Sequence, residues 1–132
     1  MPKILVVEDN MANSELLRDW LEAEGFQVLA AESLRQAFAF FEDQTPQAVL
    51  LDVKLGAEDG LSLARWIRQQ SHLLHLPILA VTAHALLIDH ERVMQAGCNA
   101  CISKPVDFKL LRKHLARWLP LPARLLTAPD AK

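Results

Sequence analysis

Two apolar runs in this sequence each end in acidic residues. The stretch "ILVVEDN" (residues 4–10) leads into Glu8 and Asp9, and "QAVLLD" (residues 47–52) ends in Asp52. Two like charges about 4 Å apart repel by roughly 4 kcal/mol at an effective dielectric constant near 20. Mg²⁺ removes such repulsion, since it binds one or two carboxylates together with waters and a phosphate oxygen. We therefore expect Glu8, Asp9 and Asp52 to hold a Mg²⁺ ion, provided that the fold brings the two runs together.

Two further residues could bind a phosphoryl group at the same place. Thr82 ends a third apolar run, "LPILAVT" (residues 76–82), and Lys104 follows a fourth, "NACIS" (residues 99–103). A threonine hydroxyl donates a hydrogen bond to a phosphoryl oxygen, and a lysine ammonium is a compact point charge for phosphate. Each residue alone has a simpler explanation, since acids after strands form turns or helix caps and a single lysine is usually solvated. The set as a whole favours phosphoryl chemistry.

The elements that must position these residues alternate regularly along the chain. Short apolar runs predict strands, and apolar residues repeating every three or four positions predict helices, two of them with the N-caps Ser33 and Asp107. The expected strands are residues 3–8, 26–31, 47–52, 76–82 and 99–103. The expected helices are residues 12–25, 33–44, 61–70, 85–97 and 107–119, and residues 53–60 are expected to form a loop.

This order of elements predicts the fold class. Near-continuous apolar strands joined by helices are typical of a parallel sheet that is covered on both faces. With right-handed crossovers, the result is an α/β fold: a doubly wound, flavodoxin-like sheet of five parallel strands in the order 2-1-3-4-5, with five helices. Function in such sheets sits at the carboxyl ends of the strands. Glu8, Asp9, Asp52, Thr82 and Lys104 all end or follow strands, so we expect them to meet there.

Length and composition limit the classes of protein to which the chain can belong. Its 132 residues suit one domain, which we place at residues 1–119, and the proline-rich residues 120–132 are expected to be a tail or a linker stub. The hydrophobic fraction of 52% favours a packed core over disorder. A net charge of -2 gives no nucleic-acid footprint, and no apolar run is long enough to cross a bilayer. We expect a cytoplasmic protein that binds neither nucleic acid directly nor a membrane.

The whole set of residues resembles the receiver domain of two-component response regulators, and the resemblance covers residues 3–119. Four motifs carry it, in the right order and at the right strand ends: "VVEDN", "LLDVKLGAEDG", "AVTAHA" and "GCNACISKP". The resemblance implies that Asp52 is the phospho-acceptor, that Thr82 is the switch hydroxyl and that Lys104 is the phosphate-binding cation. The peptide bond between Lys104 and Pro105 is then expected to be cis.

The resemblance also implies a metal shell around Mg²⁺. Asp9 is expected to bind the metal directly, and Glu8 is expected to act mostly through water. Asp52 contributes its carboxylate, and the backbone carbonyl of Lys54 is expected to complete the shell. All four assignments come from the family pattern and not from the spacing of the residues.

A receiver of this kind takes a phosphoryl group from a histidine on a partner, here a sensor histidine kinase or a histidine phosphotransfer protein. The chain is expected to catalyse only its own phosphorylation and dephosphorylation, so we do not class it as an enzyme. Phosphorylation biases a pre-existing equilibrium between two conformers. A downstream protein then binds the face formed by the fourth helix, the fifth strand and the fifth helix, and dimerisation on phosphorylation is left open.

Four positions depart from the usual receiver pattern. Cys101 stands where many receivers have the switch aromatic, which puts the usual coupling to the switch hydroxyl in question. Gly56 stands where the active-site loop often has proline, so that loop is expected to be more mobile. Lys54 and His84 lie two residues after the acceptor and the switch hydroxyl, beside the path of the attacking water. We hypothesise that these two side chains set the lifetime of the phosphate.

Cys98 and Cys101 form a CxxC motif, for which core packing is the favoured role. A redox CxxC opens a helix after an early strand, and no second CxxC exists here to complete a zinc site. Trp20 and Trp66 lie at apolar positions of helices and are expected to pack in the core. Trp118 is equally suited to packing or to contact with a partner.

Three alternatives stand beside a stand-alone regulator. The start "MPKILVVEDN" favours the stand-alone setting, while the proline-rich end leaves room for a receiver excised from a hybrid sensor kinase. An aspartyl-phosphate phosphatase or phosphotransferase would need a second Asp two residues after its nucleophile, where this chain has Lys54. A pseudo-receiver that is never phosphorylated is disfavoured, since Asp9, Asp52, Thr82 and Lys104 are all present.

Overall fold

The computed structural model describes residues 2–83 and 87–119, with the backbone alone for Leu87 and Ile88. Within this part of the chain, the main sheet has five parallel strands, which are β1 (Lys3–Val7), β2 (Gln27–Ala31), β3 (Ala48–Asp52), β6 (Ile78–Thr82) and β7 (Ala100–Ser103). Their order across the sheet is β2-β1-β3-β6-β7. Since β6 and β7 are the expected fourth and fifth strands, the predicted order 2-1-3-4-5 is confirmed.

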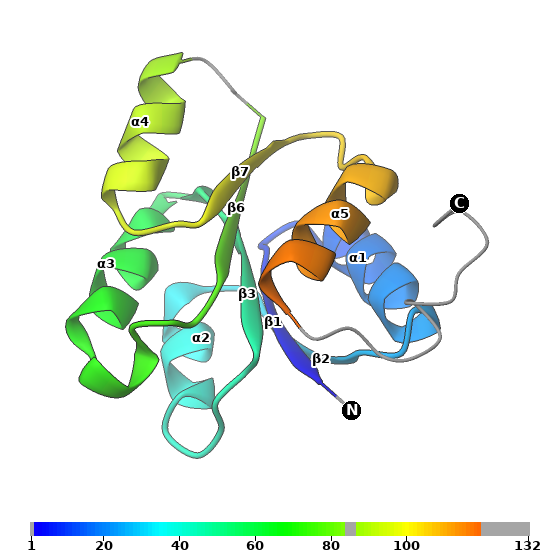
Figure 1. Cartoon of the computed structure of the whole chain (residues 1–132), viewed down its shortest axis with the longest axis horizontal. Helices are drawn as coiled ribbons and strands as arrows, with labels where there is room; N and C mark the ends of the chain where they lie inside the picture. Colours follow the sequence, from blue (N-terminus) through cyan, green and yellow to red (C-terminus); the bar gives the residue numbers. More distant parts are fainter. Residues whose placement is uncertain (1, 84–86, 120–132) are drawn as a thin grey trace.

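Helices cover both faces of this sheet, as Figure 1 shows. One face carries α1 (Met11–Ala23) and α5 (Phe108–Trp118), and the other carries α2 (Leu34–Phe40), α3 (Leu61–Gln69) and α4 (Leu87–Gln95). A short 3₁₀ helix, η1 (Ser71–Leu73), precedes β6. The doubly wound prediction is confirmed, and the expected bounds hold to within about one helical turn. No helix in the described ranges has the length and apolarity needed to cross a membrane.

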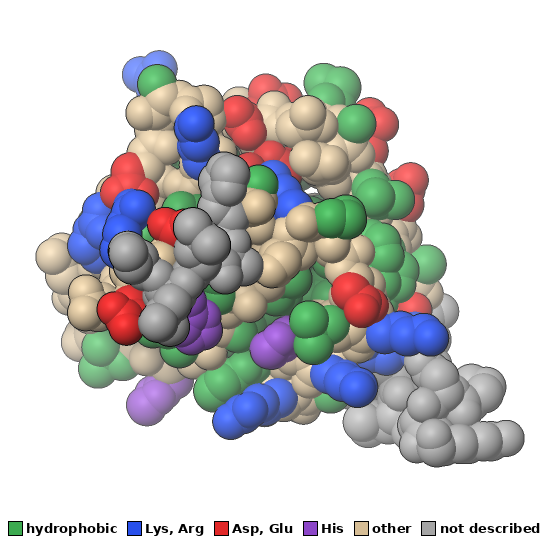
Figure 2. Space-filling model, turned by 90° about the horizontal axis from the view of Figure 1, so that it is seen from above, with side chains coloured by type: hydrophobic (Ala, Val, Ile, Leu, Met, Phe, Trp, Pro, Cys, Tyr) green, Lys and Arg blue, Asp and Glu red, His purple; other side chains and the backbone are tan. Residues whose placement is uncertain are grey.

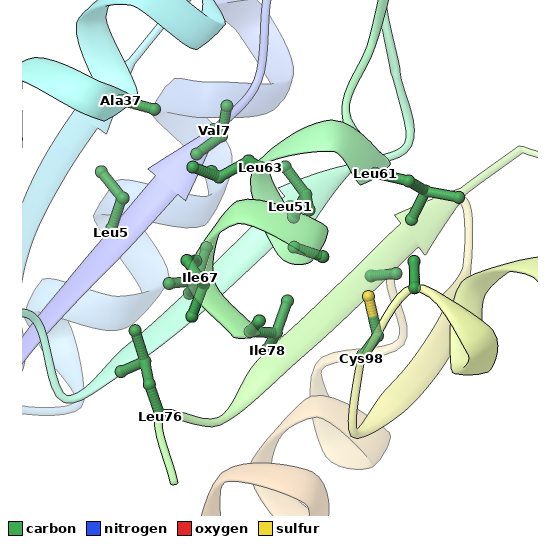
Figure 3. Close-up of a cluster of buried hydrophobic side chains, with 14 of the residues drawn as sticks. Leu5, Val7, Ala37, Leu51, Leu61, Leu63, Ile67, Leu76, Ile78 and Cys98 are labelled. Atoms are coloured by element: carbon green, nitrogen blue, oxygen red, sulfur yellow. The ribbon is translucent and has the colours of Figure 1, made fainter. Parts of the chain in front are cut away.

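The sheet is apolar on both faces because each strand sends alternate side chains to opposite sides. In β1, Leu5 and Val7 point toward α2, α3 and α4, while Ile4 and Val6 point toward α1 and α5. All four are at most 1% exposed, so a near-continuous apolar run is what burial on both faces requires. Figure 3 shows the cluster around Leu5 and Val7, where side chains from β3, α3 and β6 fill the space between sheet and helices.

Capping side chains fix where three of the helices begin. Ser33 and Asp107, the two predicted N-caps, accept hydrogen bonds from backbone N–H groups in the first turns of α2 and α5, at 3.2 and 2.9 Å. Asn10 caps α1 in the same way at 3.0 Å. Such a cap is worth about 1 kcal/mol. The cap at Asn10 starts α1 directly after the acidic pair, so it sets how the chain leaves the sheet at that point.

Residues 53–60 differ from the expected loop. They contain an antiparallel hairpin of β4 (Lys54–Leu55) and β5 (Glu58–Asp59), joined by Gly56 and Ala57. Gly56 has a φ of +56°, which a two-residue hairpin loop requires at this position and which proline, fixed at about −65°, cannot adopt. Strands of two residues are too short to give a periodic pattern, so the sequence did not predict them.

Arg68 of α3 holds the amino edge of the sheet together. Its guanidinium donates hydrogen bonds to the backbone carbonyls of Gly97 (2.8 Å), Leu73 (3.1 Å) and Leu74 (3.3 Å) and to Asn99 Oδ1 (2.9 Å). The same Asn99 oxygen accepts a hydrogen bond of 2.8 Å from the first backbone N–H of β6. One side chain therefore joins α3, the turn after η1, the turn between α4 and β7, and the start of β6.

The two cysteines are free thiols in or beside the core. Cys98 is buried in the cluster that Figure 3 shows, and Cys101 is half-buried against the same cluster. Burial raises the pKa of Cys98 to about 12, although the charge of Arg68 acts in the opposite direction. A buried, protonated thiol fits the expected packing role.

The tryptophans on α1 and α3 also pack as expected. Trp20 stacks on Phe108 of α5 with ring centroids 5.1 Å apart. Trp66 packs edge-on against two phenylalanines in and after α2, with centroids 5.1 and 5.4 Å away. Trp118 is half-buried at the end of α5, so both of its expected roles stay predictions.

Candidate functional site

The carboxyl edge of the sheet brings the three predicted acids together. Glu8 and Asp9 directly follow β1, and Asp52 is the last residue of β3, which pairs with β1. One carboxylate oxygen from each acid lies within 4.8 Å of the other two. Glu8 and Asp52 are buried, whereas Asp9 is exposed. Figure 2 looks down on this edge and shows Asp and Glu side chains near its middle, with Lys or Arg atoms beside them.

Lys104 lies between two of these acids. Its Nζ donates to Glu8 Oε1 at 2.9 Å and to Asp52 Oδ2 at 3.0 Å, and both carboxylates are less than 10% exposed. The chain reaches this position through a cis peptide bond between Lys104 and Pro105, as the resemblance implied. One ammonium group faces three carboxylates, so the site keeps an excess of negative charge.

The pKa of Lys104 reflects these neighbours. Partial burial alone would lower it, but the hydrogen bonds and charges of Glu8 and Asp52 together outweigh burial and hold the pKa above its ordinary value. Lys104 therefore keeps its proton at neutral pH. It acts at this site as a fixed positive charge.

Thr82 ends β6 and is buried beside a groove. Val81 stands opposite Asp52 in the pairing of β3 with β6, so Thr82 lies one residue further along the carboxyl edge. The groove has a volume of about 360 Å³ and runs between the β4–β5 hairpin and α4, where Lys54 and Arg92 line it together with Thr82. The predicted switch residue therefore adjoins both the acidic site and the helix expected to respond.

The backbone around the hairpin closely approaches two of the acids. The Lys54 N–H donates to Asp52 Oδ1 at 3.1 Å, while the Lys54 side chain is exposed. A methyl group on Gly56 would stand 3.5 Å from Asp9 Oδ2. A methyl group on Gly60 would overlap the backbone carbonyl oxygen of Asp52, so only glycine fits there. The hairpin and the start of α3 thus form one wall of the site.

Two residues of the site were not predicted from the sequence, Asn10 and Gly60. The Asn10 N–H donates to Glu8 Oε2 at 3.2 Å and so fixes the carboxylate that Lys104 also holds. An asparagine directly before a helical pattern signals a helix cap but not a contact with Glu8. For Gly60, the available signal was a glycine directly before the third helical pattern. The structure does not test the Lys54 carbonyl as a metal ligand, and His84 lies outside the described residues.

The possible ligand atoms at this edge suit a hard divalent cation. They are carboxylate oxygens in excess over the one ammonium group, and Mg²⁺ prefers oxygen ligands and negative charge. Among the His, Cys, Asp and Glu residues that the structure describes, Glu8, Asp9 and Asp52 are the one group of three able to share an ion. Neither cysteine belongs to that group.

Known proteins resemble the chain over most of its length. The family model of the response regulator receiver domain matches residues 4–116. The polar-differentiation response regulator DivK of Brucella anthropi is 38% identical over 108 residues, which cover 81% of this chain and 88% of that protein. The receiver domain of sensor histidine kinase PA1611 from Pseudomonas aeruginosa, solved with a magnesium ion coordinated in its active site cleft, is 38% identical with a TM-score of 0.80, covering 89% of this chain and 96% of the other.

A second solved structure gives the same result. The signal receiver domain of a signal transduction histidine kinase from Syntrophus aciditrophicus is 30% identical with a TM-score of 0.82, and the match covers 90% of each chain. These matches confirm the resemblance that the four motifs indicated. The chain belongs to the response regulator receiver domain family of two-component signalling.

Proposed function

We propose that this chain is a phosphorylatable receiver in which Asp52 accepts a phosphoryl group from a histidine on a partner protein. The observation that carries the proposal is Lys104 held between Glu8 and Asp52, with Asp9 beside them. A buried carboxylate fixed next to a permanent cation is positioned to attack phosphorus. The excess of negative charge around it gives a divalent cation a place to bind.

The reaction transfers the phosphoryl group between two nucleophiles. An oxygen of Asp52 attacks phosphorus, the P–N bond to the donor histidine breaks, and the imidazole nitrogen keeps the electron pair. The product is an acyl phosphate, from which water later releases inorganic phosphate and restores the carboxylate. Lys104 stabilises the negative charge on the transferred oxygens, and such positioning and charge stabilisation supply most of the catalysis in phosphoryl transfer.

A metal ion belongs to the same proposal. Glu8, Asp9, Asp52 and the backbone carbonyl of Lys54 would hold Mg²⁺, which supplies further neutralisation of charge when it is bound. Support comes from the cluster of three carboxylates in this chain and from the magnesium ion in the PA1611 receiver domain. The buried pair, Glu8 and Asp52, is already oriented by Lys104, while Asp9 is the exposed member.

The output is expected on the face formed by α4, β7 and α5. Thr82 lies between the acidic site and the groove along α4, so movement of its hydroxyl toward a bound phosphoryl group would change what packs against α4. Cys101 on β7 packs against the cluster that α4 covers, and a small thiol there leaves room for such repacking. We infer that a downstream protein binds this face in the phosphorylated state.

The proposal also covers whether the receiver is a separate protein and which protein donates the phosphoryl group. The relatives include both a response regulator and receiver domains of histidine kinases, at similar identity. We retain the stand-alone cytoplasmic regulator with a receiver domain at residues 1–119. A sensor histidine kinase or a phosphotransfer protein would be its phosphoryl donor.

Intact mass measurement tests the proposed acceptor. Incubation with acetyl phosphate and Mg²⁺ should add the mass of one phosphoryl group to the native chain. Asp52→Asn should add none, because an amide cannot form the acyl phosphate. A native chain that never gains this mass would instead be a binding module that is not phosphorylated.

Lys54 is the described residue proposed to set the lifetime of the phosphate. Its side chain is exposed and lines the groove that Thr82 also borders. We infer that the attacking water reaches the site through this groove. The rate of autodephosphorylation in Lys54→Ala, compared with native protein and with Lys3→Ala at the far end of β1, tests this role. Equal rates in all three proteins would remove Lys54 from the proposal, and His84→Ala tests the second predicted residue in the same assay.

A further inference from the structure

The exposed side of α1 carries a row of acids. Glu15, Asp19 and Glu22 are all exposed, recur at helical spacing, and are called the acidic ridge below. None of them forms an ion pair with another described residue. They repel one another, because residues three or four apart lie on the same side of a helix. Arg18 lies beside this ridge, on the side of α1 turned away from α5, where it lines a cavity together with Glu15 and Glu32.

The exposed side of α5 carries the opposite charge. Lys109, Lys113 and Arg117 are exposed, lie four residues apart, and are called the basic ridge below. The helix contains no acidic residue, and none of the three pairs with an acid in the described part of the chain. Arg112, the remaining arginine of α5, pairs with Glu24 of α1 at 2.7 Å.

An apolar seam between the two ridges fixes α1 against α5. Trp20 stacks on Phe108 at 5.1 Å, and the Arg112 guanidinium lies 5.9 Å from the centre of the Trp20 ring. Leu16 is 57% exposed and borders a cavity of about 100 Å³ that Pro105, Phe108 and two residues of the acidic site also line. Figure 1 shows both helices on the same face of the sheet. The face therefore combines opposite charges with an exposed leucine beside a hollow that a partner side chain can fill.

We propose that this α1–α5 face binds a second copy of the chain in a symmetric dimer. In this dimer the acidic ridge of each protomer lies against the basic ridge of the other, and every contact occurs twice. A two-fold axis directed roughly along the helices produces this arrangement. An axis across the helices would set α1 against α1 and α5 against α5, which the like charges oppose. The charge pattern selects the first arrangement, and it does so without phosphorylation of Asp52.

A second copy fits this face better than it fits the face formed by α4, β7 and α5. In the described part of α4 the exposed acid is Glu91, while Asp89 lines the groove beside Arg92. The acidic ridge offers three acids to the three cations of the basic ridge. A different partner would need a basic and an acidic row in matching positions, which a second copy supplies by symmetry.

Sedimentation equilibrium of the full, unphosphorylated chain tests for the dimer. The mass should rise from 14.8 kDa toward twice that value as the protein concentration is raised. Raising NaCl from about 0.05 M to about 0.5 M should shift it back toward the monomer, because exposed charges are screened within a short distance at high salt. A monomer at every concentration and at both salt levels would overturn the proposal.

Charge reversal identifies the interface. Lys113→Glu and Asp19→Lys should each raise the dissociation constant of the dimer by about tenfold or more, since each sets like charges against each other. An equimolar mixture of the two variants should dimerise again, because the reversed residues then face each other and the unchanged ridges still match. Far-UV circular dichroism shows whether both variants keep their fold.

Glu91→Lys on α4 is the matched control and should leave the dimer unchanged. A dimer that is lost in Glu91→Lys but kept in Asp19→Lys would place the interface on α4. Failure of the mixed variants to associate would equally exclude the paired ridges. Each of these results would overturn the proposed dimer while leaving the phosphorylation of Asp52 untouched.

Discussion

Two partly buried cations hold opposite edges of the same sheet, and their partners differ in kind. Lys104 at the carboxyl edge bridges two carboxylates, at 2.9 and 3.0 Å. Arg68 at the amino edge bonds only neutral oxygens among the described residues, three backbone carbonyls and one side-chain amide. Burial lowers the pKa of Arg68, whereas for Lys104 the carboxylates outweigh burial and raise the pKa.

At the amino edge, contacts within the fold already balance the buried polar groups. At the carboxyl edge, a ligand is needed to balance the charge. The Arg68 guanidinium donates hydrogen bonds to four acceptors of the fold, so no ligand has to bind there. Around Lys104, three carboxylates share one ammonium group, and the exposed Asp9 forms no ion pair with the described residues. Local rules of charge balance are broken where function is expected, and a metal ion or a phosphoryl group would restore the balance.

Removal of Lys104 is expected to have the largest effect on function. In Lys104→Met, phosphorylation of Asp52 by acetyl phosphate at saturating Mg²⁺ should slow by about 10²–10³-fold, as is usual when one preorganised electrostatic group is lost. The initial rate of mass gain measures this. Lys3→Met, which removes a lysine at the amino edge, is the control and should keep the native rate. A Lys104→Met variant as fast as this control would show that the carboxyl edge does not depend on its cation.

Removal of Arg68 should affect stability instead of phosphorylation. Arg68→Met should lower the free energy of unfolding by about 2–4 kcal/mol, because three partly buried acceptors and one exposed acceptor lose their donor at once. Urea unfolding measures the loss. Arg65→Met, which breaks an exposed ion pair with Asp59, should cost less than about 0.5 kcal/mol. The contrast between the two edges would fail if the two arginine variants were equally mild, or if Arg68→Met also slowed phosphorylation.

The carboxyl edge could be predicted from the sequence because it depends on strand ends. Alternating strands and helices fix which residues end parallel strands, and ends that follow apolar runs are visible in the sequence. The sequence alone therefore predicts that Asp52, Thr82 and Lys104 lie at one edge. It does not predict the ion pairs of Lys104 with Glu8 and Asp52, because a side-chain position depends on packing that no local pattern records.

The amino edge was not predicted at all. Arg68 lies 29 and 31 residues from Gly97 and Asn99, and backbone carbonyls carry no residue-specific signal. A methyl group on Gly97 would overlap the Arg68 side chain, and Gly97 has a φ of +107°, so this contact also depends on a turn conformation. The β4–β5 hairpin was missed for a similar reason, since two-residue strands have no period to detect.

A smaller effect is expected from the exposed acid of the carboxyl edge. Asp9→Asn should weaken Mg²⁺ binding by about tenfold or more, because one charged ligand is lost, while the free energy of unfolding should change by less than about 0.5 kcal/mol. Isothermal titration calorimetry with MgCl₂ measures the affinity. Asp43→Asn, at an exposed acid outside the site, is the control. Equal Mg²⁺ affinity in both variants would mean that the metal does not bind at this edge.

The smallest expected effect is a loss of stability at alkaline pH, which is absent at neutral pH. It arises mainly from Cys98, which lies beside Arg68. Burial raises the pKa of Cys98 from 9.0 to about 12, with the charge of Arg68 opposing the shift. Above pH 9 the unfolded chain therefore loses the thiol proton while the folded chain keeps it. The folded state then binds more protons, so stability falls as pH rises, by up to about 1.4 kcal/mol per pH unit.

Lys104 has the same sign but acts at higher pH, since its ion pairs stabilise the fold below the ordinary lysine pKa and are lost as pH rises through its raised pKa. Between about pH 9 and about pH 10, close to the ordinary thiol and lysine values, the loss should therefore come from the two thiols, Cys98 and also Cys101, whose pKa burial raises as well. Urea unfolding across this interval should give a flatter pH dependence for Cys98→Ala than for native protein, while Lys104→Met should keep the native slope. If Lys104→Met flattened the slope and Cys98→Ala did not, the alkaline sensitivity would belong to the carboxyl edge, and the thiol next to Arg68 would be less well buried than its surroundings indicate.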